Sequence, residues 1–250
     1  MNIIISPAKK MEMDEDIVYP SSSPVFLPQA KELRQVLAGY SREELKSLYK
    51  ANDAITELNY QRIREMDLEK GRTPAVLAYI GIQYQSMAPR VFTDSQWEYV
   101  KDHLWILSGF YGALRAMDGI VPYRLEMQAK LPVGEKKDLY EYWGDKIYKE
   151  LRKKSSITVN LASKEYSRIL EPYLTKEHRF ITCVFGSLSE GKKGLQVKVK
   201  ATEAKAARGT MVRWMAGRLL EDPEELKKFT ERGYRYSPEY SKENEFVFLL

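Results

Sequence analysis

Apolar residues in this chain form short β-branched runs that are separated by longer stretches of helical spacing. Residues 3–5 are three isoleucines followed by Ser-Pro, which predicts a buried strand that ends in a loop. Residues 157–161 and 246–249 are further strand-like runs, and residues 76–82 are compatible with another. Runs at 179–185 and 195–199, joined by Gly, Ser and Lys, predict a β-hairpin.

Helices are predicted where capping residues come before apolar positions of helical period. Ser41 with Glu44, and Thr93 with Gln96, have the spacing of capping boxes. After Thr93 the apolar positions repeat at helical spacing as far as Leu107, so we expect a core-facing helix through that residue.

The C-terminal third continues this mixture of elements. Residues 203–220 are expected to be helical, and Asp222 followed by Pro223 is typical of the start of another short helix. Strands and helices do not alternate regularly along the chain. The pattern therefore predicts an α+β fold, with a mixed β-sheet core wrapped by many helices. A doubly wound parallel sheet is the alternative. The length of the chain suits one large domain over residues 1–250 or two intimately packed ones.

The amino-acid composition indicates a globular protein without a membrane span. The chain has 250 residues, of which 44% are hydrophobic and 12% aromatic, enough to bury a substantial core. It has one cysteine, Cys183, which fits a reducing compartment. The N-terminal residues do not resemble a signal peptide, and no apolar stretch approaches the length of a membrane span. We expect a cytoplasmic protein without a membrane partner.

Basic residues are concentrated near the C-terminus. The formal net charge is +5, from 40 basic and 35 acidic residues. Between Lys192 and Arg218 the only acidic residue is Glu203. This distribution indicates a positive face that would suit a polyanion, although an ordinary solvated helix and hairpin surface explains it equally well.

The sequence lacks the residue patterns of several common kinds of functional site. His103, His178 and Cys183 show no paired ligand spacing, so no metal site is predicted. The chain has neither a Walker-type phosphate loop nor a dinucleotide-binding fingerprint, and no cofactor is expected. Ser6 is not surrounded by a glycine elbow, so it does not have the context of a nucleophile.

Two glycines suggest a phosphate-binding turn. If a helix ends at Ser108-Gly109 and another starts after Gly112, the arrangement is that of a helix-hairpin-helix, whose exposed turn amides bind a DNA phosphate. Arg115 and Arg124 would add charge there. The glycines are three positions apart, whereas the usual signature spaces them by two. A glycine helix stop followed by an ordinary helix pair is the competing interpretation.

Three dense blocks contain residues that a core does not require: residues 6–9, residues 107–145 and residues 205–209. Each combines Gly, Ala or Pro with a cation, a pairing suited to the close approach of an anion. We therefore expect Lys9, Arg124 and Arg208 to share one concave surface.

These blocks resemble the YaaA family of peroxide stress proteins. The similar strings are SPAK at 6–9, LSGFYGALR at 107–115, PYRLEM at 122–127, DLYEYWGD at 138–145, VNLASKEYS at 159–167 and KAARG at 205–209. They cover nearly the whole chain in the same order. The resemblance implies a single α+β domain with a positively charged cleft and a helix-hairpin-helix-like element. It also implies binding of duplex and branched DNA, and a role in limiting iron-dependent oxidative damage.

Two positions depart from the family pattern. Ala116 stands where a proline usually follows the LR of the hairpin string, which loosens the expected helix geometry. Ile82 stands where the family tends to carry an acidic residue, so chemistry that needs this carboxylate is in doubt.

The candidate residues fall into two groups. The DNA-binding candidates are Lys9, Ser108, Gly109, Gly112, Arg115, Arg124, Lys205 and Arg208. The cleft candidates are Ser6, Tyr123, Glu126 and Asn160. Ser163, close to Asn160, is explained without function as a helix N-cap. Trp143 and its neighbouring tyrosines are interpreted as packing residues rather than base-stacking platforms.

The leading interpretation is a DNA-binding stress protein that uses phosphate contacts and no cofactor, with double-stranded or branched DNA as its partner. The alternative is an enzyme acting on a small anionic or nucleotide-like substrate in the same cleft. An adaptor for an acidic protein has little support beyond the net charge. A closed pocket holding Lys9, Arg124, Lys205 and Arg208 would favour the enzyme, and an open groove along residues 192–218 would favour the DNA-binding protein.

Overall fold

The computed structural model describes residues 1–13, 19–71, 73–191 and 194–250. Its strands are β1 (Asn2–Ile5), β2 (Lys10–Met11), β3 (Thr73–Pro74), β4 (Tyr79–Ile80), β5 (Leu104–Ser108), β6 (Gly112–Arg115), β7 (Gly119–Ile120), β8 (Ile157–Leu161), β9 (Arg179–Gly191), β10 (Gly194–Lys198), β11 (Arg235–Tyr236) and β12 (Glu245–Leu249).

A mixed sheet forms the centre of the molecule. Its strands lie in the order β11-β12-β9-β8-β1-β5-β6, and β10 pairs with β9. The five strands from β12 to β5 are parallel to their neighbours, whereas β11 and β6 run antiparallel at the two edges. β1 is completely buried, as expected for a strand with three consecutive isoleucines in the middle of a parallel sheet.

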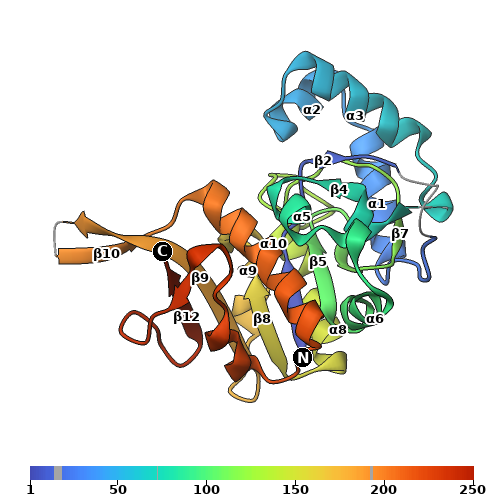
Figure 1. Ribbon diagram of the computed structural model, residues 1–250. Helices are drawn as coiled ribbons and strands as arrows, with labels where there is room; N and C mark the ends of the chain where they lie inside the picture. Colours follow the sequence, from blue (N-terminus) through green and yellow to red (C-terminus); the bar gives the residue numbers. More distant parts are fainter. Residues whose placement is uncertain (14–18, 72, 192–193) are drawn as a thin grey trace.

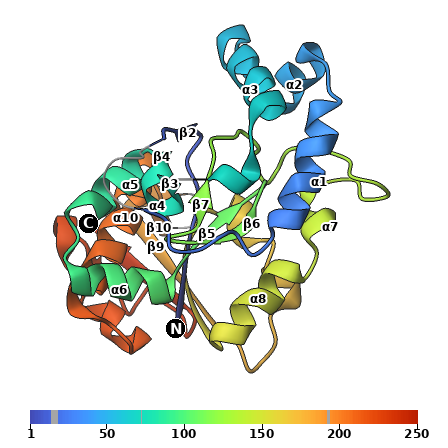
Figure 2. The same ribbon diagram turned by 90° about the vertical axis from the view of Figure 1, so that its right-hand side faces the viewer.

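Helices cover both faces of this sheet. The α-helices are α1 (Leu27–Ala38), α2 (Arg42–Tyr49), α3 (Asp53–Glu65), α4 (Ala75–Ala78), α5 (Ile82–Met87), α6 (Asp94–His103), α7 (Leu139–Trp143), α8 (Lys146–Lys154), α9 (Lys164–Ser167) and α10 (Ala201–Arg218). Short 3-10 helices lie at Leu68–Lys70, Pro89–Val91, Glu171–Tyr173, Pro223–Lys228 and Glu231–Gly233. Figure 2 shows α5, α6 and α10 on one side of the sheet and α1, α7 and α8 on the other. The α+β fold predicted from the sequence is confirmed.

The start signals identified in the sequence act as expected. The Ser41 and Thr93 side chains accept hydrogen bonds from the backbone of Glu44 and Gln96, and both capping boxes are complete. Asp222 caps the 3-10 helix that begins at Pro223. None of the helices in the described part of the chain is long and apolar enough to cross a membrane.

Two predicted elements differ from those in the structure. The helix that begins after Thr93 stops at His103, because Leu104 to Ile106 pair with β1 as strand β5. Helical spacing of apolar residues cannot separate one long helix from a helix followed by a fully buried strand. Residues 76–82 are not one strand either, since they contain α4 and the two-residue strand β4.

The predicted helix-hairpin-helix element is wrong. Residues 104–115 form an antiparallel β-hairpin, in which Ser108 pairs with Gly112 and Ile106 with Leu114. The amides expected to bind a phosphate are used inside the protein, because Phe110 N and Tyr111 N donate to Ser108 Oγ at 3.1 and 2.9 Å. Ser108 itself is fully buried.

The two glycines of this turn serve packing. A Cβ on Gly109 would lie 2.7 Å from the Leu125 carbonyl oxygen. Gly112 has a φ of +72°, and a Cβ there would lie 2.7 Å from the ring of Trp143. Trp143 is fully buried and donates from Nε1 to the Gly109 carbonyl at 2.9 Å, so the packing interpretation of this tryptophan is confirmed. Replacing Gly112 by valine would therefore disturb the core and would not isolate a DNA contact.

A C-terminal hairpin is present as predicted, but the run at 179–185 pairs with β8 and β12, and residues 187–191, predicted as the connecting loop, pair with β10. β9 and β10 pair antiparallel from Ser187–Lys198 to Gly191–Gly194, and Figure 1 shows this hairpin extending away from the body. Lys192 and Lys193, which belong to the basic segment identified in the sequence, lie outside the described residues. At the base of the hairpin the chain continues into α10, whose predicted helical character is confirmed.

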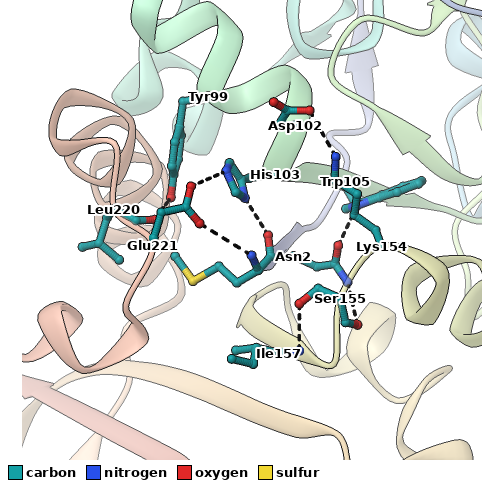
Figure 3. A network of polar contacts seen from close by, with 11 residues as sticks. Asn2, Tyr99, Asp102, His103, Trp105, Lys154, Ser155, Ile157, Leu220 and Glu221 are labelled. Carbon is teal, nitrogen blue, oxygen red and sulfur yellow. Dashed lines mark hydrogen bonds and ion pairs between the residues drawn. The ribbon is translucent and has the colours of Figure 1, made fainter.

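A polar network closes the amino end of the central strands (Figure 3). His103 Nδ1 lies 2.7 Å from the Met1 carbonyl oxygen, and its Nε2 lies 3.1 Å from Glu221. Trp105 Nε1 donates to Asn2 Oδ1 at 3.2 Å, and Asn2 donates to the Leu151 carbonyl at 2.9 Å. These contacts provide hydrogen-bond partners for polar groups at the amino ends of the strands, so they stabilise the fold. The functional site is therefore expected at the carboxyl ends of the strands.

Candidate functional site

A pocket with a volume of about 420 Å3 lies beyond the carboxyl ends of β1 and β8. In open sheets with parallel strands, ligands bind in such crevices, especially where neighbouring strands are reached by separate excursions of the chain, as β5 and β8 are on the two sides of β1. The lining residues come from five segments far apart in sequence. They are Ser6, Pro7, Ala8, Lys9, Lys10, Ile80, Gly81, Ile82, Gln83, Tyr84, Tyr123, Arg124, Leu125, Glu126, Ser163, Glu165, Tyr166, Lys205 and Arg208.

The loop after β1 is fastened on both sides. Ser163 N donates to Ser6 Oγ at 2.8 Å, which ties the end of β1 to the end of β8. The Tyr84 hydroxyl donates to the Ser6 carbonyl at 2.9 Å. Lys10 then pairs with Ile80 between β2 and β4. Ser163 is the N-cap residue of α9, as predicted, but its hydroxyl lies 3.2 Å from Ser6 Oγ and does not cap the helix.

Buried tyrosines form one wall of the pocket. Tyr123 is 6% exposed, and its hydroxyl lies 2.7 Å from that of Tyr79 and 2.6 Å from Ser108 Oγ. Tyr84 and Tyr166 are also buried and line the same space. Because their hydroxyls are already bonded within the protein, Tyr84 and Tyr123 present a fixed, largely apolar surface to a ligand.

Helix α10 also lines the pocket and supplies cations. Lys205 and Arg208 are one turn apart on this helix, and both line the pocket. The small residues of the same string have another role, since a Cβ on Gly209 would lie 1.9 Å from the Gln83 carbonyl oxygen. Gly209 thus allows α10 to approach α5 closely, whereas the sequence pattern predicts that it makes room for an anion.

The charge of Arg208 has no partner in the part of the chain that the structure describes. Among the described residues Arg208 makes no hydrogen bond and no ion pair, and its Nε is buried without a partner. Burial lowers the pKa of the guanidinium, which still stays protonated at any ordinary pH. An uncompensated, largely buried cation is costly to folding, so its presence beside a pocket points to an anionic ligand.

Three residues form a mixed charge cluster at the other side. Lys9 Nζ lies 3.0 Å from Glu126 Oε2, and an Arg124 nitrogen lies 3.4 Å from Glu126 Oε1. Arg124 is only 12% exposed and its Nε has no hydrogen-bond partner. Glu126 is therefore occupied by two cations, while Arg124 keeps donor capacity that the described protein atoms do not use.

Glu165 is the second carboxylate of the pocket. Gln128 N donates to its Oε1 at 3.3 Å, and among the described residues it forms no ion pair with a cationic side chain. Burial raises the pKa of this carboxyl group, and the nearby charge of Glu126 raises it further. The Gln128 N–H and the more distant Lys9 act in the opposite direction but do not prevail.

The predicted convergence of the three sequence blocks is confirmed. Lys9, Arg124 and Arg208 line one pocket, and four further candidates join them: Ser6, Tyr123, Glu126 and Lys205. That these residues bind DNA stays a prediction.

Five candidates lie elsewhere. Ser108, Gly109 and Gly112 belong to the buried β-turn behind the tyrosine wall. Arg115 lies on the edge strand β6, where it packs over Trp105 and approaches Glu150 to 3.9 Å. Asn160 is 3% exposed, accepts from Ala162 N and donates to Thr182 Oγ1, so it supports the end of β8.

Some residues that line the pocket are not among the candidates predicted from the sequence. Glu165 and Tyr166 lie in the VNLASKEYS string, and Gln83 and Tyr84 follow Gly81. The strings were visible, but which of their side chains face the pocket depends on how α9 and α5 are placed. Ile82, at the position where the resemblance predicted an acid, is 39% exposed in the pocket lining and leaves it without a third carboxylate. Within the described ranges, no three His, Cys, Asp or Glu side chains group closely enough to hold a metal ion.

The fold and the pocket define an α+β protein with a cation-bearing site at the carboxyl ends of its central parallel strands. Residues 1–240 match the family model of the peroxide stress protein YaaA. The chain belongs to this family, as the resemblance of its motifs suggested.

Relatives share the whole chain and not only the motifs. A UPF0246 protein of Desulfitobacterium hafniense is 49% identical over 249 residues, covering 100% of this chain and 98% of the relative. UPF0246 proteins of Agathobacter rectalis and Ligilactobacillus salivarius are 48% and 47% identical over 99% and 100% of this chain, and 98% and 99% of their own lengths. All segments that line the pocket fall within these matches.

Proposed function

We propose that this member of the peroxide stress family binds a small anionic, nucleotide-like ligand in the pocket between α10 and the loop after β1. The observation that carries the proposal is Arg208, a largely buried guanidinium without a partner among the described residues. Guanidinium groups bind phosphate and carboxylate through paired charge-assisted hydrogen bonds. Lys205, one turn away and exposed, adds a second positive charge on the same wall.

The dimensions of the pocket favour a small molecule. Its volume of about 420 Å3 falls within the range of roughly 300–1,000 Å3 typical of small-ligand sites. One pocket is lined by all four of the cations Lys9, Arg124, Lys205 and Arg208. This arrangement is expected of a site for a small substrate, whereas a DNA-binding protein would be expected to have an open groove. Tyrosine and aliphatic side chains make up much of the remaining wall, which suits a ligand with a ring.

Isothermal titration with inorganic phosphate and with nucleoside monophosphates tests this proposal. Arg208→Gln should weaken binding by roughly 10- to 100-fold, since a hydrogen bond to a charged group contributes about 1.5–3 kcal/mol. Arg213→Gln is the matched control, because Arg213 is an exposed residue of the same helix outside the pocket lining. Unchanged affinity in Arg208→Gln, or an equal loss in both variants, would contradict the proposal. Chromatography of the ligand after incubation reveals any turnover.

Binding of DNA is a second candidate, supported by a surface that shares only Lys205 with the pocket lining. Lys198, Lys200 and Lys205 are exposed from the base of the β9–β10 hairpin to α10, and among the described residues they form no ion pair. Lysines without ion pairs in this part of the described chain are suited to phosphate contacts along a duplex. Such contacts carry little sequence information, so binding of this kind would be weakly selective.

Mutations and salt titrations distinguish small-ligand binding from DNA binding. Replacing Lys198 and Lys200 together by alanine should flatten the dependence of log affinity for duplex DNA on log salt by about one to two units, since each contact contributes about 0.9. The same double variant should leave phosphate binding in the pocket intact. Salt-insensitive DNA binding, or an undiminished slope in the double variant, would eliminate this surface as a DNA interface.

A further inference from the structure

Helix α10 contributes only cations to the pocket lining, Lys205 and Arg208. Both carboxylates come from other segments, Glu126 from the segment after β7 and Glu165 from α9, and they line the pocket together with Lys9, Lys10 and Arg124. A ligand that contacts both α10 and a carboxylate of the lining should carry negative charge for the first and hydrogen-bond donors for the second.

Glu165 is the carboxylate that remains available to such donors. Both oxygens of Glu126 already face cations, Oε2 toward Lys9 and Oε1 toward Arg124. Glu165 is held instead by backbone N–H groups of the 127–128 segment and by the bond from Tyr140 to its own carbonyl oxygen at 2.8 Å. A carboxylate has about four acceptor positions, so these contacts leave capacity for a ligand.

The pocket also has an aromatic lining. Tyr84, Tyr123 and Tyr166 line it, and Tyr123 is fixed by hydrogen bonds to Tyr79 and Ser108. Aromatic side chains stack on planar rings of any base. A planar, donor-bearing ring therefore matches the tyrosines together with Glu165.

We propose that the ligand is a free guanine mononucleotide, with its phosphate at Arg208 and Lys205 and the N–H donors of its base at Glu165. This inference rests on the function proposed above and adds the identity of the base. Guanine presents a ring N–H and an adjacent amino group on one edge, which a carboxylate accepts as a pair. Hypoxanthine retains only the ring N–H, and adenine presents an acceptor nitrogen at the corresponding position.

Titration of the wild-type protein with four probes tests each part of the ligand. GMP should bind at least about tenfold more tightly than IMP, and IMP more tightly than AMP, since a matched polar pair contributes about 1–3 kcal/mol of discrimination. Guanosine, which lacks the phosphate, should lose at least about tenfold relative to GMP. Equal binding of GMP, IMP and AMP would overturn the guanine assignment and leave the anion-binding proposal standing. Failure of inorganic phosphate and of all nucleotides to bind would overturn both.

The variant Glu165→Gln tests whether Glu165 recognises the base. It keeps the size of the side chain but replaces one acceptor by a donor, so the preference for GMP over IMP should disappear. Glu43→Gln, at an exposed position of α2, should behave like wild type. If Glu165→Gln unfolds, as judged by circular dichroism, the IMP and AMP titrations of the wild-type protein decide the question without it. A retained GMP preference in folded Glu165→Gln would overturn the role of this carboxylate.

A single-stranded oligonucleotide containing guanine distinguishes a free nucleotide from a base within nucleic acid. We expect it to bind the pocket more weakly than GMP, because a chain continues on both sides of each phosphate. Binding that is more than about tenfold tighter than GMP and is abolished by Glu165→Gln would overturn the free-nucleotide assignment.

Discussion

Gly209 of α10 lies so close to the backbone of Gln83 in α5 that a Cβ at position 209 would be 1.9 Å from the Gln83 carbonyl oxygen. This contact sets the distance between the helix that carries Arg208 and the segment that carries Tyr84. The glycine next to the candidate anion-binding residue is therefore needed for the shape of the pocket, not for contact with the ligand.

Gly209→Ala should destabilise the protein and reduce ligand binding. The added methyl group meets backbone, which cannot move aside like a flexible side chain, so a cost of roughly 1–3 kcal/mol or more is expected. Gly217→Ala is the control in the same helix, since its Cβ would lie 3.3 Å from the Gln96 side-chain amide and alanine favours the helix. Thermal unfolding of both variants checks this, and equal stabilities would contradict the close-contact argument.

Arg208→Gln should not destabilise the ligand-free protein. The substitution removes a charge that is partly withdrawn from water and has no partner among residues 1–13, 19–71, 73–191 and 194–250, so the Tm should stay constant or rise by a few degrees. Saturating phosphate should then raise the Tm of the wild-type protein but not that of the variant. A fall of several degrees without ligand would mean that Arg208 makes a stabilising contact.

The proposed guanine preference should depend on pH through Glu165. Burial and Glu126 raise the pKa of this carboxyl group against the opposing effects of Lys9 and the Gln128 N–H. Its acceptor form is thus lost at a higher pH than that of an ordinary glutamate, near 4.3. The GMP-to-IMP affinity ratio should fall as pH is lowered toward that range, with a midpoint above 4.3. A midpoint at or below 4.3 would contradict the raised pKa.

His178 should make the protein less stable in mild acid. It is 7% exposed, its Nε2 lies 2.8 Å from Thr158 Oγ1, and burial lowers its pKa to about 4. Between about pH 6.5 and 4 the unfolded chain binds a proton at this site that the folded protein does not. Stability is therefore fully present above about 6.5 and falls as pH decreases, by up to roughly 3 kcal/mol at this site.

Denaturant unfolding at pH 7.5 and pH 5 measures this effect. His178→Gln should have a pH slope near pH 5 that is smaller by about 1.4 kcal/mol per pH unit. An NMR titration of His178 with a midpoint near 6.5 would contradict the prediction directly.

Cys183 should react slowly with thiol reagents and with hydrogen peroxide in the folded protein. The side chain is 1% exposed in β9, and burial raises the pKa of the thiol to about 12. Because the thiolate is the reactive form, both access and ionisation oppose oxidation. Labelling with an aromatic disulfide reagent should be complete in denaturant and much slower without it. Rapid labelling of the folded protein would contradict the burial of this thiol.

The sequence by itself determined the elements whose signals are local. Three isoleucines predict β1, the Ser41 and Thr93 capping boxes predict the starts of α2 and α6, and the apolar runs predict β8, the β9–β10 hairpin and β12. The resemblance of separate motifs also identified the family, because motifs are read directly from residue order.

Only the tertiary structure decided how these pieces are used. Residues 104–115 have a helix-compatible period and two glycines, yet pairing with β1 makes them a β-hairpin, because hydrogen bonding to a buried neighbour outweighs local propensity. Likewise no local pattern reveals that Glu165 and Lys9 line the same pocket, or that Arg208 has no partner among the described residues. Those facts depend on contacts between residues more than a hundred positions apart, and such contacts exist only once the sheet has brought the strand ends together.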